Sequence, residues 1–101
     1  MKLKIWVDDV RKPPAGYVWC QSVNGAKECI AFHEFAGATI ELLDMDHDAG
    51  DFYNQGGDFI EILNWLEQTG RNYPIRVHSM NPVGVENMRR IIQRNNWAEV
   101  M

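Results

Sequence analysis

Short apolar runs alternate along this chain with segments of helical periodicity, and this alternation constrains the fold more than any other feature. Three runs have the length and residue types of buried strands, at residues 3–8, 39–45 and 74–78. Three segments repeat apolar residues at helical spacing, at residues 22–35, 58–68 and 81–95. Strands and helices that alternate in this way form parallel βαβ units, so the sequence predicts an α/β fold with a mostly parallel sheet.

Two shorter segments extend this sheet. Residues 17–20 read as a strand, but only about eight residues separate them from the first run, whereas a parallel crossover takes about a dozen or more. We therefore expect either an antiparallel pairing or an edge strand with an unusual connection. Residues 97–100 would add one more short strand. Ser22 and Asn81 suit the N-caps of the first and last helices.

Size and composition predict one domain over residues 1–101, with enough hydrophobic residues, 46%, for a core. A net charge of −4 argues against binding to long duplex nucleic acid, which needs a surplus of cations. Cys20 and Cys29 lack a CxxC spacing, so reduced thiols are expected. No apolar run approaches the ~18 residues that span a bilayer, and we expect a cytoplasmic protein without membrane contacts.

Polar residues able to bind metal or move protons follow each of the three main strands directly: Asp8-Asp9, Asp46-His47-Asp48 and His78-Ser79. Ligands of open α/β sheets collect beyond the carboxyl ends of the strands. Carboxylates held close together repel one another unless they share a cation, and oxygen ligands suit Mg²⁺ or Mn²⁺. The sequence therefore predicts a metal site made of four aspartates: Asp8, Asp9, Asp46 and Asp48.

Further polar groups at the same edge complete a candidate phosphate site. His47 and His78 can act as general acid or base, because imidazole gives and takes protons near neutral pH. Ser79 and Asn81 lead into the last helix, whose N-terminal N–H groups can bind phosphate, and Arg11 can donate two hydrogen bonds to one. Turn and cap roles would explain any one of these residues alone. The convergence of three strand ends favours a site.

The acids from residue 44 onward also imitate a calcium-binding EF-hand loop. Asp44, Asp46 and Asp48 alternate as such a loop requires, but Ala49 and Gln55 stand where it needs Gly and Glu. The EF-hand interpretation fails, and Asp44, inside the strand, is expected to be structural.

Three segments resemble one known family: WVDDVR at 6–11, DHDAG at 46–50, and VHSMNPVG at 77–84 followed by ENM at 86–88. They are similar to the cyclic-phosphate processing receiver domains, and the resemblance covers nearly the whole chain. It implies a receiver-like, flavodoxin-like three-layer fold, with a mostly parallel sheet of four to five strands and about three helices. It also implies processing of cyclic phosphate ends.

The resemblance assigns receiver positions to the strand-end residues. Asp8 and Asp9 correspond to the acidic pair that helps to bind Mg²⁺ in response regulators, and Asp46 to the phosphoacceptor. His78-Ser79 lies near the receiver hydroxyl position. Two features depart from receivers: no lysine follows Lys27, so the lysine that contacts the phosphoryl group is absent, and the first receiver helix is missing.

These observations favour a metal-dependent phosphoesterase that acts on the cyclic phosphate of a small nucleotide or an RNA end, as RNA repair would require. Asp46, His47 and His78 would be its catalytic residues. Two other classes remain open: a phosphoryl-accepting signalling domain or its non-catalytic relative, and a module that binds a cyclic nucleotide without turnover.

Overall fold

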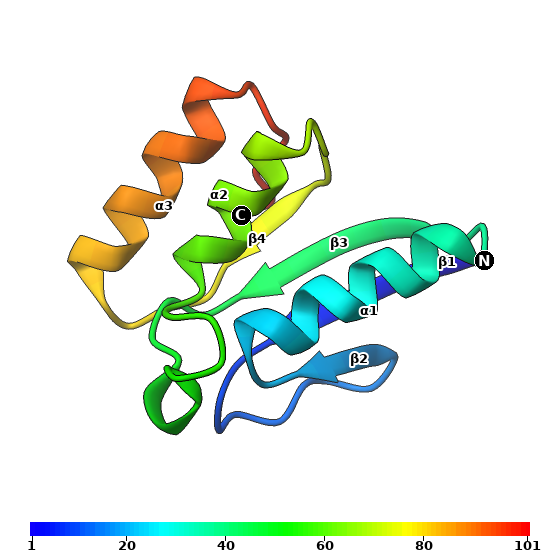
Figure 1. Cartoon of the computed structure of the whole chain (residues 1–101). Coiled ribbons are helices and arrows are strands. Elements are labelled where there is room, and N and C mark those ends of the chain that lie inside the picture. Colours follow the sequence, from blue (N-terminus) through cyan, green and yellow to red (C-terminus); the bar gives the residue numbers. More distant parts are fainter.

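The computed structural model describes residues 1–101 and contains one sheet of four parallel strands (Figure 1). The strands are β1 (Lys2–Val7), β2 (Tyr17–Cys20), β3 (Thr39–Met45) and β4 (Ile75–Val77), in the spatial order β2-β1-β3-β4. This is the strand order of flavodoxin-like receiver sheets as far as four strands allow. The three main strands that the apolar runs predict are confirmed.

β2 lies at the edge of the sheet and pairs in parallel with β1. The antiparallel alternative is therefore wrong, and an edge strand with an unusual connection is what forms. Residues 8–16 make this connection without a helix, so the first receiver helix is missing as expected. The indole N–H of Trp6 donates to the carbonyl of Arg11 at 2.8 Å and ties the loop back to β1.

Three helices follow the later strands: α1 (Val23–Phe35), α2 (Ile60–Gln68) and α3 (Pro82–Arg94), with a short 3-10 helix, η1 (Gly50–Phe52), before α2. The predicted caps are confirmed, because Ser22 and Asn81 accept hydrogen bonds of 3.0 Å from the backbone N–H three residues later. α2 begins later than expected. The N–H of Phe59 donates to the carbonyl of His47 at 2.8 Å and so belongs to the preceding loop.

One hydrophobic core joins the sheet to all three helices. Its strand members alternate along β1 as Leu3, Ile5 and Val7, so they share one face of the sheet. Its helical members come from every helix: Val23, Ala26, Ile30, Ile62, Leu63, Leu66, Met88, Ile91 and Ile92. The helices therefore cover the same face (Figure 1). The expected three layers are reduced to two, because the missing helix would have covered the other face.

The second face of the sheet carries aromatic and charged side chains instead of a helix. Trp6 lies opposite Asp44, and Asp44 lies opposite Arg76. Trp6 packs edge-on against Tyr17 with ring centroids 5.6 Å apart. Trp6 and Leu42 are buried yet do not belong to the main core. This face holds the polar contacts that lead to the site.

Residues 97–100 do not form a fifth strand. A single bridge joins Ile75 to Glu99, and Ile75 exchanges hydrogen bonds with Ala98 and Val100 at 2.9 and 2.8 Å.

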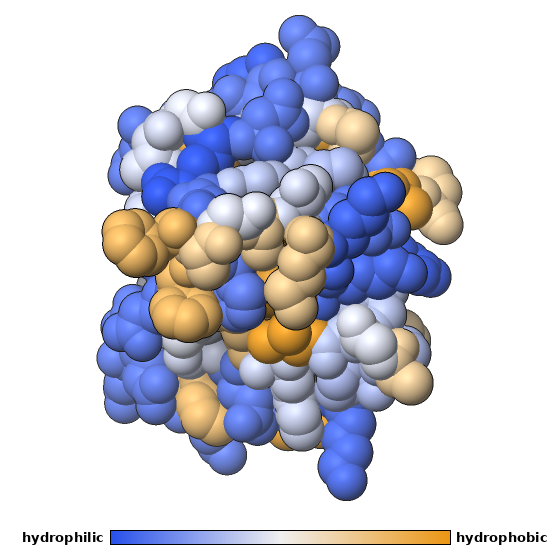
Figure 2. Space-filling view, turned by 90° about the vertical axis from the view of Figure 1, so that its right-hand side faces the viewer, coloured by the Kyte–Doolittle hydropathy of each residue, from blue (hydrophilic) through white to orange (hydrophobic).

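None of the helices has the length and apolar character to cross a membrane. Figure 2 shows the end of the molecule that holds the N-terminus, where hydrophobic side chains lie scattered among hydrophilic ones. The polar strand ends lie at the opposite end of the sheet.

Candidate functional site

The carboxyl ends of β1, β3 and β4 are neighbours because these strands are adjacent and parallel. Two backbone hydrogen bonds of 2.8 Å hold the exits together: Asp46 N–H donates to the carbonyl of Val7, and His78 N–H to that of Met45. The apolar strands bury their own side chains, so the polar residues that follow them meet at one edge of the sheet. The predicted convergence is confirmed.

Asp8, Asp9 and Asp46 form the first group at this edge. Each offers a carboxylate oxygen, and these oxygens lie within 4.8 Å of one another. Asp8 is buried, whereas Asp9 and Asp46 are half-buried. Three carboxylates at this spacing have the donor chemistry of a Mg²⁺ or Mn²⁺ site.

Asp8 is the most firmly held of the three. One of its oxygens accepts from the backbone N–H groups of Val10 and Arg11 at 3.0 and 2.8 Å, and the other accepts from His78 Nε2 at 3.0 Å. Burial raises the pKa of Asp8, but these hydrogen bonds outweigh it and leave the pKa below its ordinary value. Asp8 therefore stays ionised beside the other two acids.

Asp9 has the opposite balance. Burial raises the pKa of Asp9, and the charges of Asp8 and Asp46 raise it further. Its carboxylate lies against Gly50, where an added Cβ would overlap the oxygen Oδ2. Gly50 also has φ of 54°, so both space and backbone geometry favour glycine there. The chain thus brings a carboxylate into a place where its charge is disfavoured.

His78 connects this group to the second face of the sheet. Its Nε2 donates to Asp8, and its Nδ1 lies 2.7 Å from an oxygen of Asp44. The imidazole stacks on Trp6 with centroids 3.9 Å apart and an angle of 9°. Asp44 is fully buried and also accepts from Tyr17 at 3.3 Å. Asp44 therefore orients the imidazole, a role that its position inside a strand did not reveal.

His47, Asp48 and Asp58 form a second group, whose ligand atoms also lie within 4.8 Å of one another. The sequence placed Asp48 with the other three aspartates, but its carboxylate lies 2.6 Å from His47 Nδ1 and 3.1 Å from the amide of Asn81. Hydrogen bonds from His47 and Asn81 lower the pKa of Asp48. The turn after Asp46 separates the two groups.

His47 packs against the first turn of α3. A Cβ added at Gly84 would lie 2.7 Å from His47 Nδ1, so only glycine lets the ring approach the helix. The side chain of His47 is 14% exposed. It holds the loop against α3.

The predicted phosphate ligands are spread around the site. Ser79 Oγ accepts from the N–H of Asn81 at 3.1 Å, and the side chain of Asn81 caps α3 by accepting from the N–H of Gly84. Since Pro82 has no N–H, only Val83 offers a free amide in the first turn of α3. Arg11 is exposed at the start of the loop. Its backbone, and not its guanidinium, contacts Asp8.

A comparison with protein families matches residues 3–94 to the cyclic-phosphate processing receiver domain. The chain belongs to this family. The match covers β1 through α3 and so includes every residue of both polar groups. Comparisons with curated proteins and with solved structures give no match.

This cyclic-phosphate processing receiver domain lacks the cation of ordinary receivers. Its lysines are Lys2, Lys4, Lys12 and Lys27, and none lies in β4 or the loop after it. The nitrogen of Lys4 lies 5.7 Å from the ring of Tyr17, and that of Lys27 lies 5.9 Å from the ring of Trp65. At the end of β4, near the receiver hydroxyl position, this domain has His78 against Asp8.

Proposed function

We propose that this receiver domain is a metal-dependent phosphoesterase that opens the cyclic phosphate of a nucleotide or an RNA end. The observation that supports it is the meeting of Asp8, Asp9 and Asp46 with His78, whose Nε2 lies 3.0 Å from Asp8. Cleavage of a phosphate ester needs charge stabilisation and a proton for the leaving oxygen. A cation site next to an imidazole can supply both.

The first group fits Mg²⁺ or Mn²⁺ by its donors. The raised pKa of Asp9 reflects burial and repulsion from Asp8 and Asp46, and a bound cation would relieve that repulsion. Asp9 and Asp46 have the more accessible oxygens, because both oxygens of Asp8 already accept hydrogen bonds. When bound, the metal would polarise the phosphate and stabilise charge on its non-bridging oxygens.

His78 would provide the proton. Its Nδ1 faces an oxygen of Asp44 and its Nε2 faces an oxygen of Asp8. Ionised carboxylates can only accept hydrogen bonds, so hydrogen bonds to both of them require an imidazolium with a proton on each nitrogen. In the hydrolysis, a bond forms between the water oxygen and phosphorus, and one ring P–O bond breaks. The alkoxide takes a proton from His78 Nε2, and the attacking water releases its proton to solvent. His78 then recovers a proton from solvent, so each turnover consumes one water and no net proton.

A binding-only domain is the second candidate, and one observation favours it. Both ring nitrogens of His78 are already bonded, so proton transfer to a substrate requires Nε2 to exchange Asp8 for the leaving oxygen. A module that recognises the cyclic phosphate without cleaving it needs no such exchange.

The test incubates a 2′,3′-cyclic nucleotide with Mg²⁺ or Mn²⁺ and wild type, Asp46→Asn or His78→Ala, and separates products by chromatography. We expect wild type to form a monoester and His78→Ala to lose about a hundredfold or more in kcat, the usual scale for a general acid or base. His33→Ala is the matched control, because His33 bonds to Cys29 within α1. If wild type binds the cyclic phosphate but never cleaves it with either metal, the binding module replaces the enzyme.

A further inference from the structure

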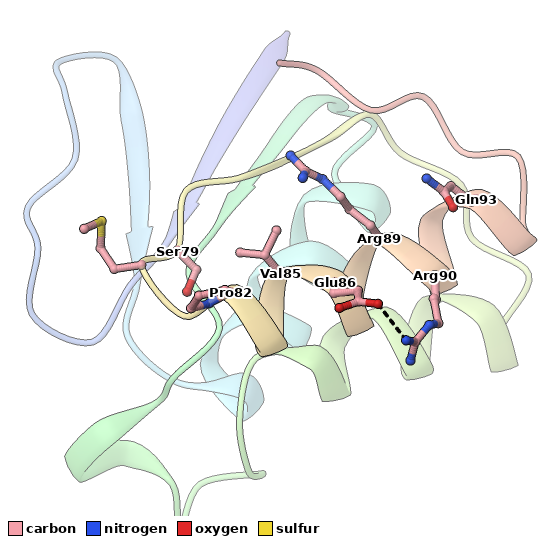
Figure 3. A pocket seen from close by; sticks show the side chains of 8 residues that line it. Ser79, Pro82, Val85, Glu86, Arg89, Arg90 and Gln93 are labelled. Atoms are coloured by element: carbon pink, nitrogen blue, oxygen red, sulfur yellow. Dashed lines mark hydrogen bonds and ion pairs between the residues drawn. The ribbon is translucent and has the colours of Figure 1, made fainter.

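A groove of about 690 Å³ runs along the outer side of α3 (Figure 3). It begins at Ser79 and Met80, passes Pro82 and Val85, and ends between arginines of the later turns, Arg89 and Arg90. Cavities of this size suit ligands larger than a phosphate ion. Its near end includes Ser79, which directly follows His78 in the chain and is one of the predicted phosphate ligands.

The two arginines of the groove differ in how they are held. Arg89 bonds to Glu99 at 2.7 Å, and Glu99 is 18% exposed. Arg90 bonds to Glu86 at 2.9 Å in an i, i+4 pair whose side chains are 65% and 68% exposed (Figure 3). It also donates to the exposed side chain of Asn87 at 3.0 Å. Such solvated pairs contribute little and exchange partners readily. Arg90 is therefore the guanidinium that a ligand phosphate can recruit.

The length of α3 sets the size of that ligand. Pro82 and Arg90 are eight residues apart, which is about 12 Å along a helix. A single nucleotide with one cyclic phosphate at the strand ends does not carry a second phosphate to Arg90. A nucleotide chain that ends in the cyclic phosphate does.

We propose that the groove along α3 binds the single-stranded nucleotide chain next to the cyclic phosphate, and that Arg90 contacts a phosphate of that chain. Met80, Pro82 and Val85 provide apolar surface for the sugars and bases between the two phosphates. A net charge of −4 disfavours contacts with many phosphates of a nucleic acid, but it is compatible with the single contact between Arg90 and one phosphate. This proposal rests on the proposed function and selects the chain end over the mononucleotide as the substrate.

The test compares a short oligonucleotide ending in a 2′,3′-cyclic phosphate with the cyclic mononucleotide, for wild type and Arg90→Gln. We expect Arg90→Gln to raise KM for the oligonucleotide about tenfold and to leave the mononucleotide unchanged. Arg94→Gln is the matched control, since Arg94 belongs to the same helix but bonds to Glu67 outside the groove. Glu86→Gln releases Arg90 and should lower KM for the oligonucleotide.

Binding measured by fluorescence anisotropy separates this proposal from the function itself. For a labelled oligonucleotide with the cyclic end, Arg90→Gln should reduce the slope of log K against log salt by about 0.7, the value for one single-strand phosphate contact. Equal affinities and slopes for wild type and Arg90→Gln would overturn the groove proposal, whether or not turnover occurs. Arg90-dependent binding without turnover would support the groove and reject the enzyme.

Discussion

Replacing Asp44 by alanine tests the buried polar network directly. Asp44 is fully buried and bonds to His78 Nδ1 at 2.7 Å and to the Tyr17 hydroxyl at 3.3 Å, with Arg76 at 3.7 Å. Removing one partner from a buried ionic network costs about 3–5 kcal/mol, because it leaves the other polar groups without partners. Since small domains are stable by about 5–15 kcal/mol, Asp44→Ala should lose a large part of the free energy of unfolding.

Urea unfolding with matched variants measures this cost. Tyr17→Phe removes only one long hydrogen bond and should cost about 0.5–1.5 kcal/mol. Asp44→Asn keeps an acceptor for His78 but removes the charge, so its cost should lie between those of Tyr17→Phe and Asp44→Ala. The reasoning is refuted if Asp44→Ala costs less than about 1 kcal/mol, or no more than Tyr17→Phe, because the network then contributes nothing beyond single hydrogen bonds.

Three other predictions follow from the same contacts. A divalent metal at tenfold its Kd should stabilise the fold by about 1.4 kcal/mol, measured as a higher Tm with the metal than with EDTA. Asp9→Asn should raise the Tm of the metal-free protein, because it removes the repulsion from Asp8 and Asp46. If the Tm is the same with metal, with EDTA and in Asp9→Asn, the three aspartates have only a structural role. Acetyl phosphate or beryllofluoride should leave the mass of the protein unchanged, because no lysine lies in β4 or the loop after it. A stable adduct on Asp46 would favour a signalling domain. Hydrogen bonding from Cys20, with help from His33, lowers the pKa of Cys29, so iodoacetamide should alkylate Cys29 faster at pH 7 than it alkylates an unperturbed thiol. Slow modification at pH 7 that matches an unperturbed thiol would contradict this.

The sequence predicts the sheet and the strand-end residues because their signals are local. Apolar runs that stop at an acid, such as the one before Asp8, identify a strand and its exposed end together. The caps at Ser22 and Asn81 are equally local, since each bonds to an amide three residues away. These features need no knowledge of which segments meet in space.

What the sequence does not predict depends on pairing between distant segments. Asp44 has an ordinary position inside a strand, and its role depends on β4 bringing His78 beside it across 34 residues. Asp48 looks equivalent to Asp46, yet the turn between them sends it toward Asn81. The parallel direction of β2 is also not predicted by short-range rules, because a loop that Trp6 ties to β1 makes the connection in place of a crossover helix.

Anomalous diffraction from crystals soaked in Mn²⁺ tests most directly whether the strand ends form a metal site. We expect one peak between Asp8, Asp9 and Asp46, with oxygens of Asp9 and Asp46 at direct bonding distance, and its loss in Asp46→Asn. The contrary result is a fully soaked crystal with no peak there, or with a peak only at His47, Asp48 and Asp58. Either outcome would remove the metal from the proposed chemistry of this receiver domain.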